Sequence, residues 1–271
     1  MLSNELKNAT DIVKEAGRIL LEYYHQDYKI EFKKGDGPVT EADKASNDFI
    51  ISRLRELYPD DGILSEESKD DFKRLEKERV WSVDPMDGTR EFIDKVGQFA
   101  AMIGLVENGK SVLGVVYQPT TDTLFSAVKG QGAFLIRKGE KSPLKVSDFS
   151  DPSRMRLVVS RSHRSPLVDA IMSSLGIGKD ISSGSVGLKV GLMVEQKADL
   201  YIHPNSKTKE WDTCAPQIIL EEAGGKITDC WGEPLTYNKK NVYNDKGFAA
   251  SNGQTHSEII EKIAPFLAQM D

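Results

Sequence analysis

The chain has 271 residues, 39% of them hydrophobic, and a formal net charge of −6. This length fits one large domain or two closely packed subdomains. The negative charge argues against a general binder of nucleic acid or of anionic membrane surfaces. No apolar run approaches the roughly 20 residues of a membrane span, and the polar N-terminus has no signal-peptide apolar region, so we expect a cytoplasmic protein. Cys214 and Cys230 lack a histidine at zinc-ligand spacing and are expected to be reduced thiols.

Two helices are predicted in the first 60 residues. Apolar residues recur at helical spacing over 3–24, which predicts an amphipathic helix. The charged, glycine-rich segment 31–38 indicates an exposed loop. A second helix is expected to begin near Lys44 and to end at Tyr58-Pro59. The densely charged segment 70–79 favours a solvated face over a binding patch.

Strands dominate the middle of the chain. Short strands are predicted at 63–64 and 80–83, and turn signals separate three more that form an antiparallel meander, at 100–106, 112–117 and 123–127. A polar segment, 137–152, then divides an N-terminal α+β subdomain (1–150) from a C-terminal α/β subdomain (151–271). In the second part strands at 157–160, 199–202 and 248–251 alternate with helices at 165–175, 186–196, 213–223 and 257–267. This alternation indicates an α/β layer arrangement.

The segment from Trp81 to Phe92 is the most informative one. Asp84 and Asp87 flank a proline directly after a predicted strand, so we expect them in a turn where the strand ends. Gly88 allows close approach of an anion, and Thr89 adds a hydroxyl. Carboxylates beside a phosphate-sized gap suit Mg²⁺ and a phosphoryl group. An Asp-Pro turn alone is most often only a turn, so other segments must supply further ligands.

Three other acidic segments are candidates for the same site. Glu66 and Glu67 follow the strand at 63–64, although simple surface exposure would also explain them. Asp212 stands at the start of a predicted helix, where it could equally be a cap. Thr40 and Asp43 precede the second helix and match a capping pattern as well as a site.

Taken in order, four motifs resemble those of the inositol-monophosphatase-like superfamily of Mg²⁺-dependent, lithium-sensitive phosphomonoesterases. They are Val39-Thr40-Glu41-Ala42-Asp43, Ser65-Glu66-Glu67-Ser68, Asp84-Pro85-Met86-Asp87-Gly88-Thr89, and Trp211-Asp212 with Glu221-Glu222-Ala223-Gly224-Gly225-Lys226. The resemblance runs from about residue 10 to about residue 255. It implies a sugar-phosphatase-like α/β (α+β) fold, a layered αβαβα sandwich of two closely packed subdomains.

The resemblance also implies two or three Mg²⁺ ions per site. Glu66, Asp84 and the backbone carbonyl of Met86 would hold the first ion. Asp84 would bridge to a second, with Asp87 and Asp212 completing that site. Several carboxylates are needed because a phosphate monoester repels its nucleophile until its charge is neutralised.

The same resemblance assigns the catalytic residues. Thr89 and Asp43 would orient and deprotonate the attacking water, and Glu66 counts as catalytic through the first metal. The backbone N–H groups of Gly88 and Thr89 would hold phosphate oxygens. The second metal would stabilise the leaving alkoxide in an in-line displacement.

Details of the motifs favour one branch of the superfamily. Arg90-Glu91-Phe92 stands where inositol enzymes typically carry an asparagine before the phenylalanine, and it looks like the CysQ-type 3′(2′),5′-bisphosphate nucleotidases. Ser160-Arg161-Ser162-His163, Gly184-Ser185-Val186-Gly187-Leu188-Lys189 and Ala198-Asp199-Leu200-Tyr201 are similar to that branch too. The implied substrate is 3′-phosphoadenosine 5′-phosphate, giving AMP and phosphate, with 3′-phosphoadenylyl sulfate as a second substrate. The glycine-serine motif carries one extra residue here, which leaves the ligand-contacting serine open.

A second phosphate requires positive charge, for which Lys189 is the best candidate. Arg161, His163, Lys207 and Lys209 are weaker ones, and each could instead be a solvated cation or, for His163, a structural histidine. The predicted substrate contacts are Met86, Asp87, Gly88, Thr89, His163, Ser185, Lys189 and Asp212.

Alternative functions remain open at this stage. Inositol-1-phosphate or fructose-1,6-bisphosphate phosphatases share the implied metal chemistry, and a non-catalytic ligand-binding member is a third reading. The expected partner is a small phosphate ester, with no nucleic acid and no membrane span, and the chain could be a monomer or a homodimer.

Overall fold

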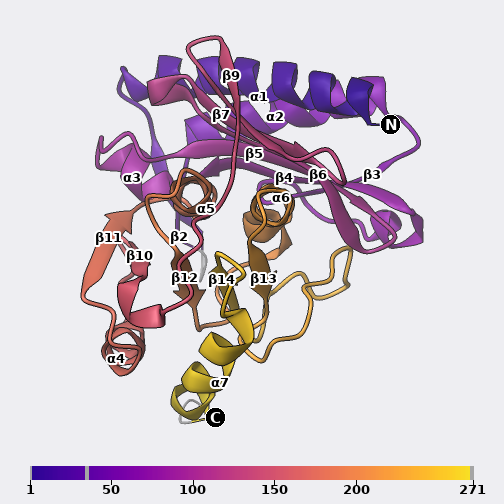
Figure 1. Ribbon diagram of the computed structural model, residues 1–271. Helices are drawn as coiled ribbons and strands as arrows, with labels where there is room; N and C mark the ends of the chain where they lie inside the picture. The colour runs from indigo at the N-terminus through magenta and orange to yellow at the C-terminus, as the bar shows by residue number, and fades with distance from the viewer. Residues whose placement is uncertain (1, 34–36, 269–271) are drawn as a thin grey trace.

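The computed structural model describes residues 2–33 and 37–268. Its largest sheet has seven strands in the order β3-β4-β5-β6-β7-β8-β9 (Figure 1). All neighbours are antiparallel except β3 and β4, which run parallel. The strands are β3 (Gly62–Ser65), β4 (Arg79–Asp87), β5 (Ala100–Glu107), β6 (Lys110–Gln118), β7 (Thr123–Val128), β8 (Ala133–Arg137) and β9 (Glu140–Pro143). The predicted antiparallel meander is therefore confirmed.

A second sheet of five strands has the order β11-β10-β12-β14-β13. β10 is parallel to β11 and β12, and the remaining pairs are antiparallel. Its strands are β10 (Arg156–Ser160), β11 (Lys179–Ser183), β12 (Leu200–His203), β13 (Lys226–Thr228) and β14 (Phe248–Ser251). A separate antiparallel pair joins β1 (Ile30–Lys33) to β2 (Gly37–Thr40).

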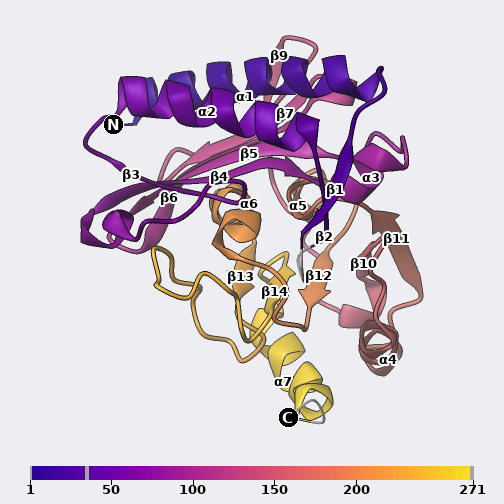
Figure 2. The ribbon, with the colours of Figure 1, turned by 180° about the vertical axis from the view of Figure 1, so that it is seen from behind.

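The helices form three layers around the two sheets (Figures 1 and 2). α1 (Ser3–Tyr24) and α2 (Glu41–Leu57) cover one face of the large sheet. α5 (Val186–Val194) and α6 (Glu210–Glu222) lie between the sheets, while α4 (Pro166–Ser174) and α7 (His256–Leu267) lie on the far side of the small sheet. The short α3 (Thr89–Ile93) follows β4. This α–β–α–β–α layering agrees with the predicted fold class.

Glycines allow α6 to sit directly on the large sheet. A Cβ at Gly104 would come within 2.5 Å of the Cys214 sulfur, and one at Gly114 within 2.4 Å of the Ala215 carbonyl oxygen. Both distances are too short for any side chain, so the helix backbone approaches β5 and β6 as closely as it can. The start of α6, which carries Asp212, is thereby held close to the large sheet, in which β4, the neighbour of β5, carries Asp84 and Asp87.

Several sequence predictions need correction. The segment 137–152 was expected only to divide the halves, but it contains β9, whose residues are all exposed and therefore show no hydrophobic alternation. Part of the expected loop 31–38 is the β1–β2 pair, and its residues 34–36 lie outside the described part of the chain. The second helix begins at Glu41, ahead of Lys44, because Thr40 caps it.

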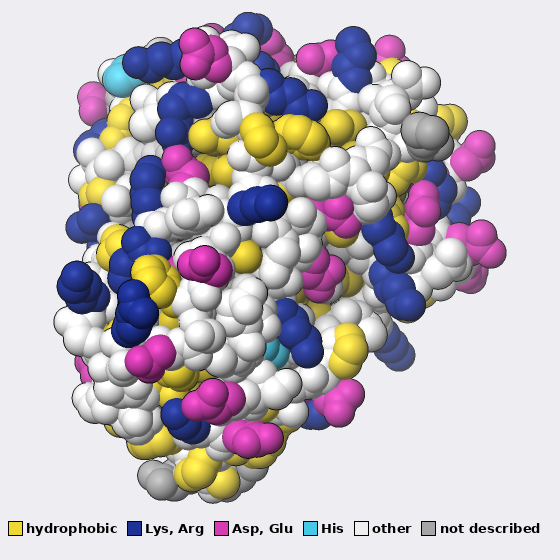
Figure 3. Space-filling view, in the orientation of Figure 1, with side chains coloured by type: hydrophobic (Ala, Val, Ile, Leu, Met, Phe, Trp, Pro, Cys, Tyr) yellow, Lys and Arg dark blue, Asp and Glu magenta, His cyan; other side chains and the backbone are white. Residues whose placement is uncertain are grey.

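The charged segment 70–79 is not simply a solvated face. Arg74, in a short 3₁₀ helix (Lys73–Glu76), is only 3% exposed. Elsewhere on the face shown in Figure 3, cationic and anionic side chains are interspersed. No helix within residues 2–33 and 37–268 is both long and apolar enough to cross a membrane. Cys214 and Cys230 are both buried free thiols.

Candidate active site

Asp84 and Asp87 lie within β4 and not in a turn after it. Asp84 pairs with Met102 and Asp87 with Ala100, and the register shifts between the two pairs. Pro85 has no N–H for the ladder, so the strand is irregular at this point, and it continues to Asp87. The prediction that the strand ends before the carboxylates was wrong by a few residues. The irregularity still turns this stretch of backbone, since Oδ1 of Asp84 accepts the Met86 N–H at 3.0 Å.

A cluster of acidic groups surrounds Asp84, which is 1% exposed. Its pKa is raised well above the usual range by burial, and then by repulsion from Glu66, Asp87 and Asp212. Glu66 comes from the end of β3, where its N–H bonds the Val83 carbonyl at 3.2 Å, and Asp212 comes from α6. The structure thus places Glu66, Asp87 and Asp212 close enough to Asp84 to raise its pKa.

Buried, mutually repelling carboxylates form a donor set that fits Mg²⁺, because hard oxygen ligands and excess negative charge favour a divalent cation. In the conformation described, no group of three or more His, Cys, Asp or Glu side chains within the described ranges is arranged to hold a metal ion. Ligation by Glu66, Asp84, the Met86 carbonyl, Asp87 and Asp212 therefore stays a prediction.

Asp87 is tied to the second half of the chain. Its Oδ2 accepts the Ser185 hydroxyl at 2.5 Å and the Gly187 N–H at 2.9 Å. Burial raises the pKa of Asp87, while Lys189 and these bonds act in the opposite direction. Ser185 has φ +55, a conformation that a residue other than glycine adopts only at some cost.

Lys189 is a buried cation and not a solvated one, being 3% exposed. It donates to the Ser185 carbonyl at 2.8 Å, and its Nζ lies 5.2 Å from the centroid of the Tyr201 ring. Burial lowers the pKa of Lys189, and Asp87 and Glu91 oppose that shift. A buried cation beside a predicted metal ligand is suited to binding an anionic group of a substrate.

Thr89 and Asp43 are in contact, as the resemblance implies. The Thr89 hydroxyl lies 3.1 Å from Oδ1 of Asp43 and 3.4 Å from the Met86 carbonyl oxygen. The capping interpretation is also confirmed, because Thr40 caps α2 and its N–H and hydroxyl donate to Oδ2 of Asp43 at 2.6 and 2.7 Å. Burial raises the pKa of Asp43 to about 6, against the effect of the Thr40 bonds. The catalytic role of the pair stays a prediction.

Asp212 likewise has a capping role in addition to its predicted one. It stands in the first turn of α6, where Oδ2 accepts the Lys209 N–H at 2.6 Å. Lys209 is 6% exposed, so the interpretation of this lysine as a surface cation was wrong. Its Nζ lies 5.1 Å from the Trp211 ring centroid and 5.4 Å from that of Tyr243. Lys207 is exposed, as expected of a solvated lysine.

Two residues that connect the predicted substrate-binding segments of the second half to the first half were not identified from the sequence. Glu91, which is 4% exposed, accepts the Ser162 hydroxyl at 2.6 Å. Oε1 of Gln98 accepts both the Arg161 side chain and the Gly184 N–H at 2.9 Å. Glu91 entered only as part of a motif, and no pattern marks Gln98, since its partners are distant in sequence.

His163 is exposed and lies at a small cavity beside the site. Tyr201 and His203 line the same cavity, and Tyr201 connects it to Lys189 through the ring contact. Two larger hollows, of about 480 and 530 Å³, contain none of the predicted site residues. Of these three hollows, the small cavity at His163 is the one that adjoins predicted site residues.

A model of the inositol monophosphatase family matches residues 1–267. The chain belongs to this family. It is 34% identical over 250 residues to the 3′(2′),5′-bisphosphate nucleotidase CysQ of Escherichia coli K12, covering 91% of this chain and 99% of that protein. The CysQ nucleotidase of Salmonella typhimurium LT2 is 36% identical over 247 residues, covering 90% and 98%.

Solved structures of the inositol monophosphatase family agree with the fold. CysQ of Bacteroides thetaiotaomicron superposes with a TM-score of 0.79 at 32% identity, covering 93% of this chain and 97% of that one. The inositol monophosphatase (IMPase) of Thermotoga maritima superposes with a TM-score of 0.82 at 25% identity, covering 99% and 100%. The predicted membership of the family, the likeness to its CysQ branch and the fold class are all confirmed.

Proposed function

We propose that this protein is a Mg²⁺-dependent 3′(2′),5′-bisphosphate nucleotidase. It removes the 3′-phosphate of 3′-phosphoadenosine 5′-phosphate to give AMP and phosphate, and accepts 3′-phosphoadenylyl sulfate as a second substrate. The observation that carries the proposal is the similarity to the CysQ nucleotidases along about nine-tenths of the chain, between 31% and 36% identity. The buried Lys189 beside Asp87 supports it, since a bisphosphorylated substrate has one more anionic group to neutralise than an inositol monophosphate.

Glu66, Asp84, the Met86 carbonyl, Asp87 and Asp212 would hold two or three Mg²⁺ ions. When bound, Mg²⁺ neutralises phosphate charge and lowers the pKa of a coordinated water. The other parts of the reaction belong to the chain. Thr89 lies between Asp43 and the Met86 carbonyl and can pass a proton from water to Asp43, whose raised pKa suits a base working near neutral pH.

The substrate rim would be divided between the two halves of the chain. Gly88 and Thr89 would contact the phosphate under attack through their backbone N–H groups. Ser185 and Lys189 would meet the second phosphate, and His163, which is exposed, would meet the base. Glu91 and Gln98 hold the segments that carry His163 and Ser185 against the first half.

The test compares phosphate release from the bisphosphonucleotide, inositol 1-phosphate and fructose 1,6-bisphosphate, with and without Mg²⁺. We expect kcat/KM to favour the nucleotide by more than about tenfold, which corresponds to about 1.4 kcal/mol. A preference of that size for inositol 1-phosphate would overturn the substrate assignment. No Mg²⁺-dependent turnover of any of the three would favour a non-catalytic ligand-binding protein.

A pair of lysine variants sharpens the comparison. Lys189→Met keeps the length of the side chain but removes the buried charge, so it should raise KM for the bisphosphonucleotide more than for inositol 1-phosphate. Lys262→Met removes a charge from an exposed lysine of the same half, on α7 and paired with Glu258 at the surface, and should leave both values unchanged. Equal losses for both substrates in Lys189→Met would contradict the role of Lys189 at the second phosphate.

A further inference from the structure

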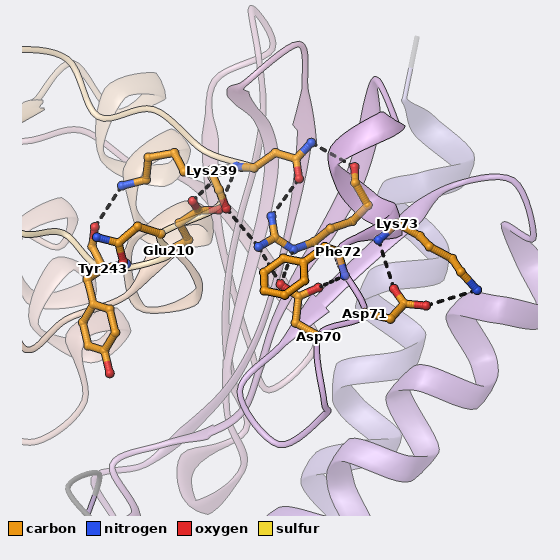
Figure 4. Close-up of polar contacts among 10 residues, drawn as sticks. Asp70, Asp71, Phe72, Lys73, Glu210, Lys239 and Tyr243 are labelled. Carbon is orange, nitrogen blue, oxygen red and sulfur yellow. Dashed lines mark hydrogen bonds and ion pairs between the residues drawn. The ribbon is translucent and has the colours of Figure 1, made fainter.

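Arg74 is the buried centre of a polar network that joins the two halves. Figure 4 shows this region, with Asp70 from the first half and Glu210 and Lys239 from the second. Its Nε and one terminal nitrogen bond Oδ2 of Asp70 at 3.0 and 2.7 Å. Its other donors reach across to the second half, to Oδ1 of Asn238 and the carbonyl of Lys239, both at 2.9 Å. With an exposure of 3%, this residue is almost entirely withdrawn from water, and four of the five N–H groups of its guanidinium bond these partners.

Asn238 also donates hydrogen bonds to the segment that carries Arg74. Its side-chain amide donates to the carbonyls of Arg74 and Lys77 at 3.0 and 3.3 Å. Its own φ is +59, the left-handed conformation that asparagine tolerates better than most residues. The connection between β3 and β4 is thus fastened to residues 238–239 by hydrogen bonds in both directions.

Glu210 completes the network at the first residue of α6. It is 1% exposed, and its two carboxylate oxygens accept the N–H groups of Asn238 and Lys239 at 2.7 and 2.8 Å. Burial raises the pKa of Glu210, and these two N–H groups and Lys239 oppose that shift. Asp212 stands two residues later, in the same helical turn.

The network therefore connects the two segments that bring Glu66 and Asp212 to the carboxylate cluster. Glu66 begins the β3–β4 connection that Arg74 fastens, and Asp212 lies in the first turn of the helix that Glu210 begins. Glu66 and Asp212 each repel the Asp84 carboxylate when both partners are charged. The hydrogen bonds among Arg74, Asn238 and Glu210 hold the two segments together independently of the carboxylates.

We propose that Arg74, Asn238 and Glu210 form a positioning clamp that sets Asp212 relative to Glu66 and Asp84 and so determines the affinity for the second Mg²⁺. This inference rests on the metal assignment in the proposed function. None of the three residues is a predicted ligand or substrate contact, so the clamp acts through Asp212. Outer partners that orient a metal ligand typically change metal affinity by about 10–100-fold when removed.

Three variants test the clamp. Asn238→Gly keeps the left-handed backbone and its N–H but removes the three side-chain hydrogen bonds to Arg74 and Lys77. Glu210→Gln replaces one of the two accepting oxygens with an amide nitrogen that cannot accept. Asn238→Asp keeps the acceptor for Arg74 but replaces the donating nitrogen with a carboxylate oxygen, which repels the carbonyls of Arg74 and Lys77. It serves if either of the other two variants folds poorly.

Asn252→Ala is the matched control. Asn252 is a fully buried amide that joins other segments, donating to the Ser147 hydroxyl at 3.1 Å and the Phe149 carbonyl at 2.9 Å. Its loss should lower the melting temperature to a similar degree without involving α6 or the β3–β4 connection. Mg²⁺ dependence of turnover, Mn²⁺ binding by calorimetry and the melting temperature are measured for each variant.

We expect the clamp variants to raise the Mg²⁺ concentration for half-maximal activity by about tenfold and to weaken Mn²⁺ binding to the same extent. Turnover at saturating Mg²⁺ should remain within about twofold of wild type, and Asn252→Ala should leave both metal constants unchanged. Wild-type metal constants in folded clamp variants, or an equal shift in Asn252→Ala, would overturn the clamp. Absence of metal-dependent turnover in the wild type would instead refute the proposed function, while Mn²⁺ binding would still test the clamp.

Discussion

The hydroxyl of Ser185 donates to Oδ2 of Asp87 at 2.5 Å, joining a residue just before α5 to one at the end of β4. The Gly187 N–H ends on the same oxygen at 2.9 Å. Both halves of the chain therefore determine the orientation of the Asp87 carboxylate. Ser185 makes this bond from a φ of +55, so the contact is maintained against a local backbone cost.

Substitutions of Ser185 separate the hydrogen bond from the backbone cost. Ser185→Ala loses the bond and keeps the strain, and we expect it to reduce the free energy of unfolding by about 1–3 kcal/mol. Ser185→Gly loses the same bond but relieves the strain, so it should be more stable than the alanine variant by about 1 kcal/mol. Urea unfolding of the two proteins side by side measures the difference. A glycine variant no more stable than the alanine variant would show that φ +55 carries no cost.

Asp43→Asn should make the protein more stable and less active. Because the folded-state pKa of Asp43 is about 6 and the ordinary value is 3.8, the fold favours the protonated form. Wild-type stability therefore falls as pH rises from about 4 through 6, by about 2–3 kcal/mol. The variant lacks this loss of stability. The difference between its free energy of unfolding and that of wild type should therefore grow in favour of the variant between these pH values and remain constant above them. Its turnover should fall by about 10²–10⁴-fold if Asp43 accepts the proton.

An equal pH dependence of stability in both proteins would contradict the raised pKa of Asp43. Turnover near that of the wild type would separately refute its role as a base. The unfolding series is run with a chelator, so that metal binding does not contribute to the comparison.

Asp84→Asn should abolish the stabilisation of the protein by Mg²⁺. Without divalent cations, the variant removes a buried, repelled charge and should melt at a higher temperature than wild type at pH 8. Added Mg²⁺ should raise the melting temperature of wild type through preferential binding to the folded state, and leave that of the variant unchanged. Differential scanning calorimetry with and without Mg²⁺ measures both effects.

Asp199→Asn is the control for that experiment. Asp199 is as buried as Asp84 but accepts from Arg156 at 2.8 Å, and these bonds with Arg156 and Ser147 outweigh burial and lower its pKa. Its replacement should lower the melting temperature in both conditions and preserve the Mg²⁺ shift. If Asp84→Asn behaved like Asp199→Asn, the metal assignment of Asp84 would be wrong.

His256 should make the fold sensitive to acid. Its ring nitrogens lie 2.8 Å from the Thr228 and Ser251 hydroxyls, and burial lowers its pKa to about 4 from 6.5. The fold favours the neutral ring, so stability is lost as pH falls from about 6.5 to 4, by up to about 3 kcal/mol. His256→Gln lacks this loss. The difference in free energy of unfolding between wild type and the variant should therefore become smaller as the pH falls over that range. A constant gap in urea unfolding would show that His256 does not titrate abnormally.

The elements that were predictable from sequence have signals that are local. The apolar stripe of α1 and the alternation and turns of β5, β6 and β7 depend only on neighbouring residues, and they are confirmed within a few positions. The acidic motifs also lie in short segments, which is why the resemblance could assign Asp84, Asp87 and Asp212 before any geometry was considered.

What could not be predicted depends on partners far away in the chain. Arg74 lies in a run of charges that is typical of a solvated surface, and its burial follows from Asn238, 164 residues later. Glu210 beside Trp211-Asp212 shows no signal of its own because its partners are backbone N–H groups. β9 was missed because none of its residues is buried. Periodicity cannot report such features, since they arise from tertiary contacts.

The packing of α5 and α6 on the large sheet has a consequence for biosynthesis. A nascent chain that ends after β9 contains every strand of that sheet, yet Met102, Val116 and Phe125 on one face still lack the residues of α5 and α6 that share their core cluster. That face is shielded from water only after α6 has left the ribosome. Asp212 arrives on the same helix, so completion of the core and assembly of the acidic cluster coincide during synthesis, and a truncated product would expose an apolar sheet as well as lack a functional site.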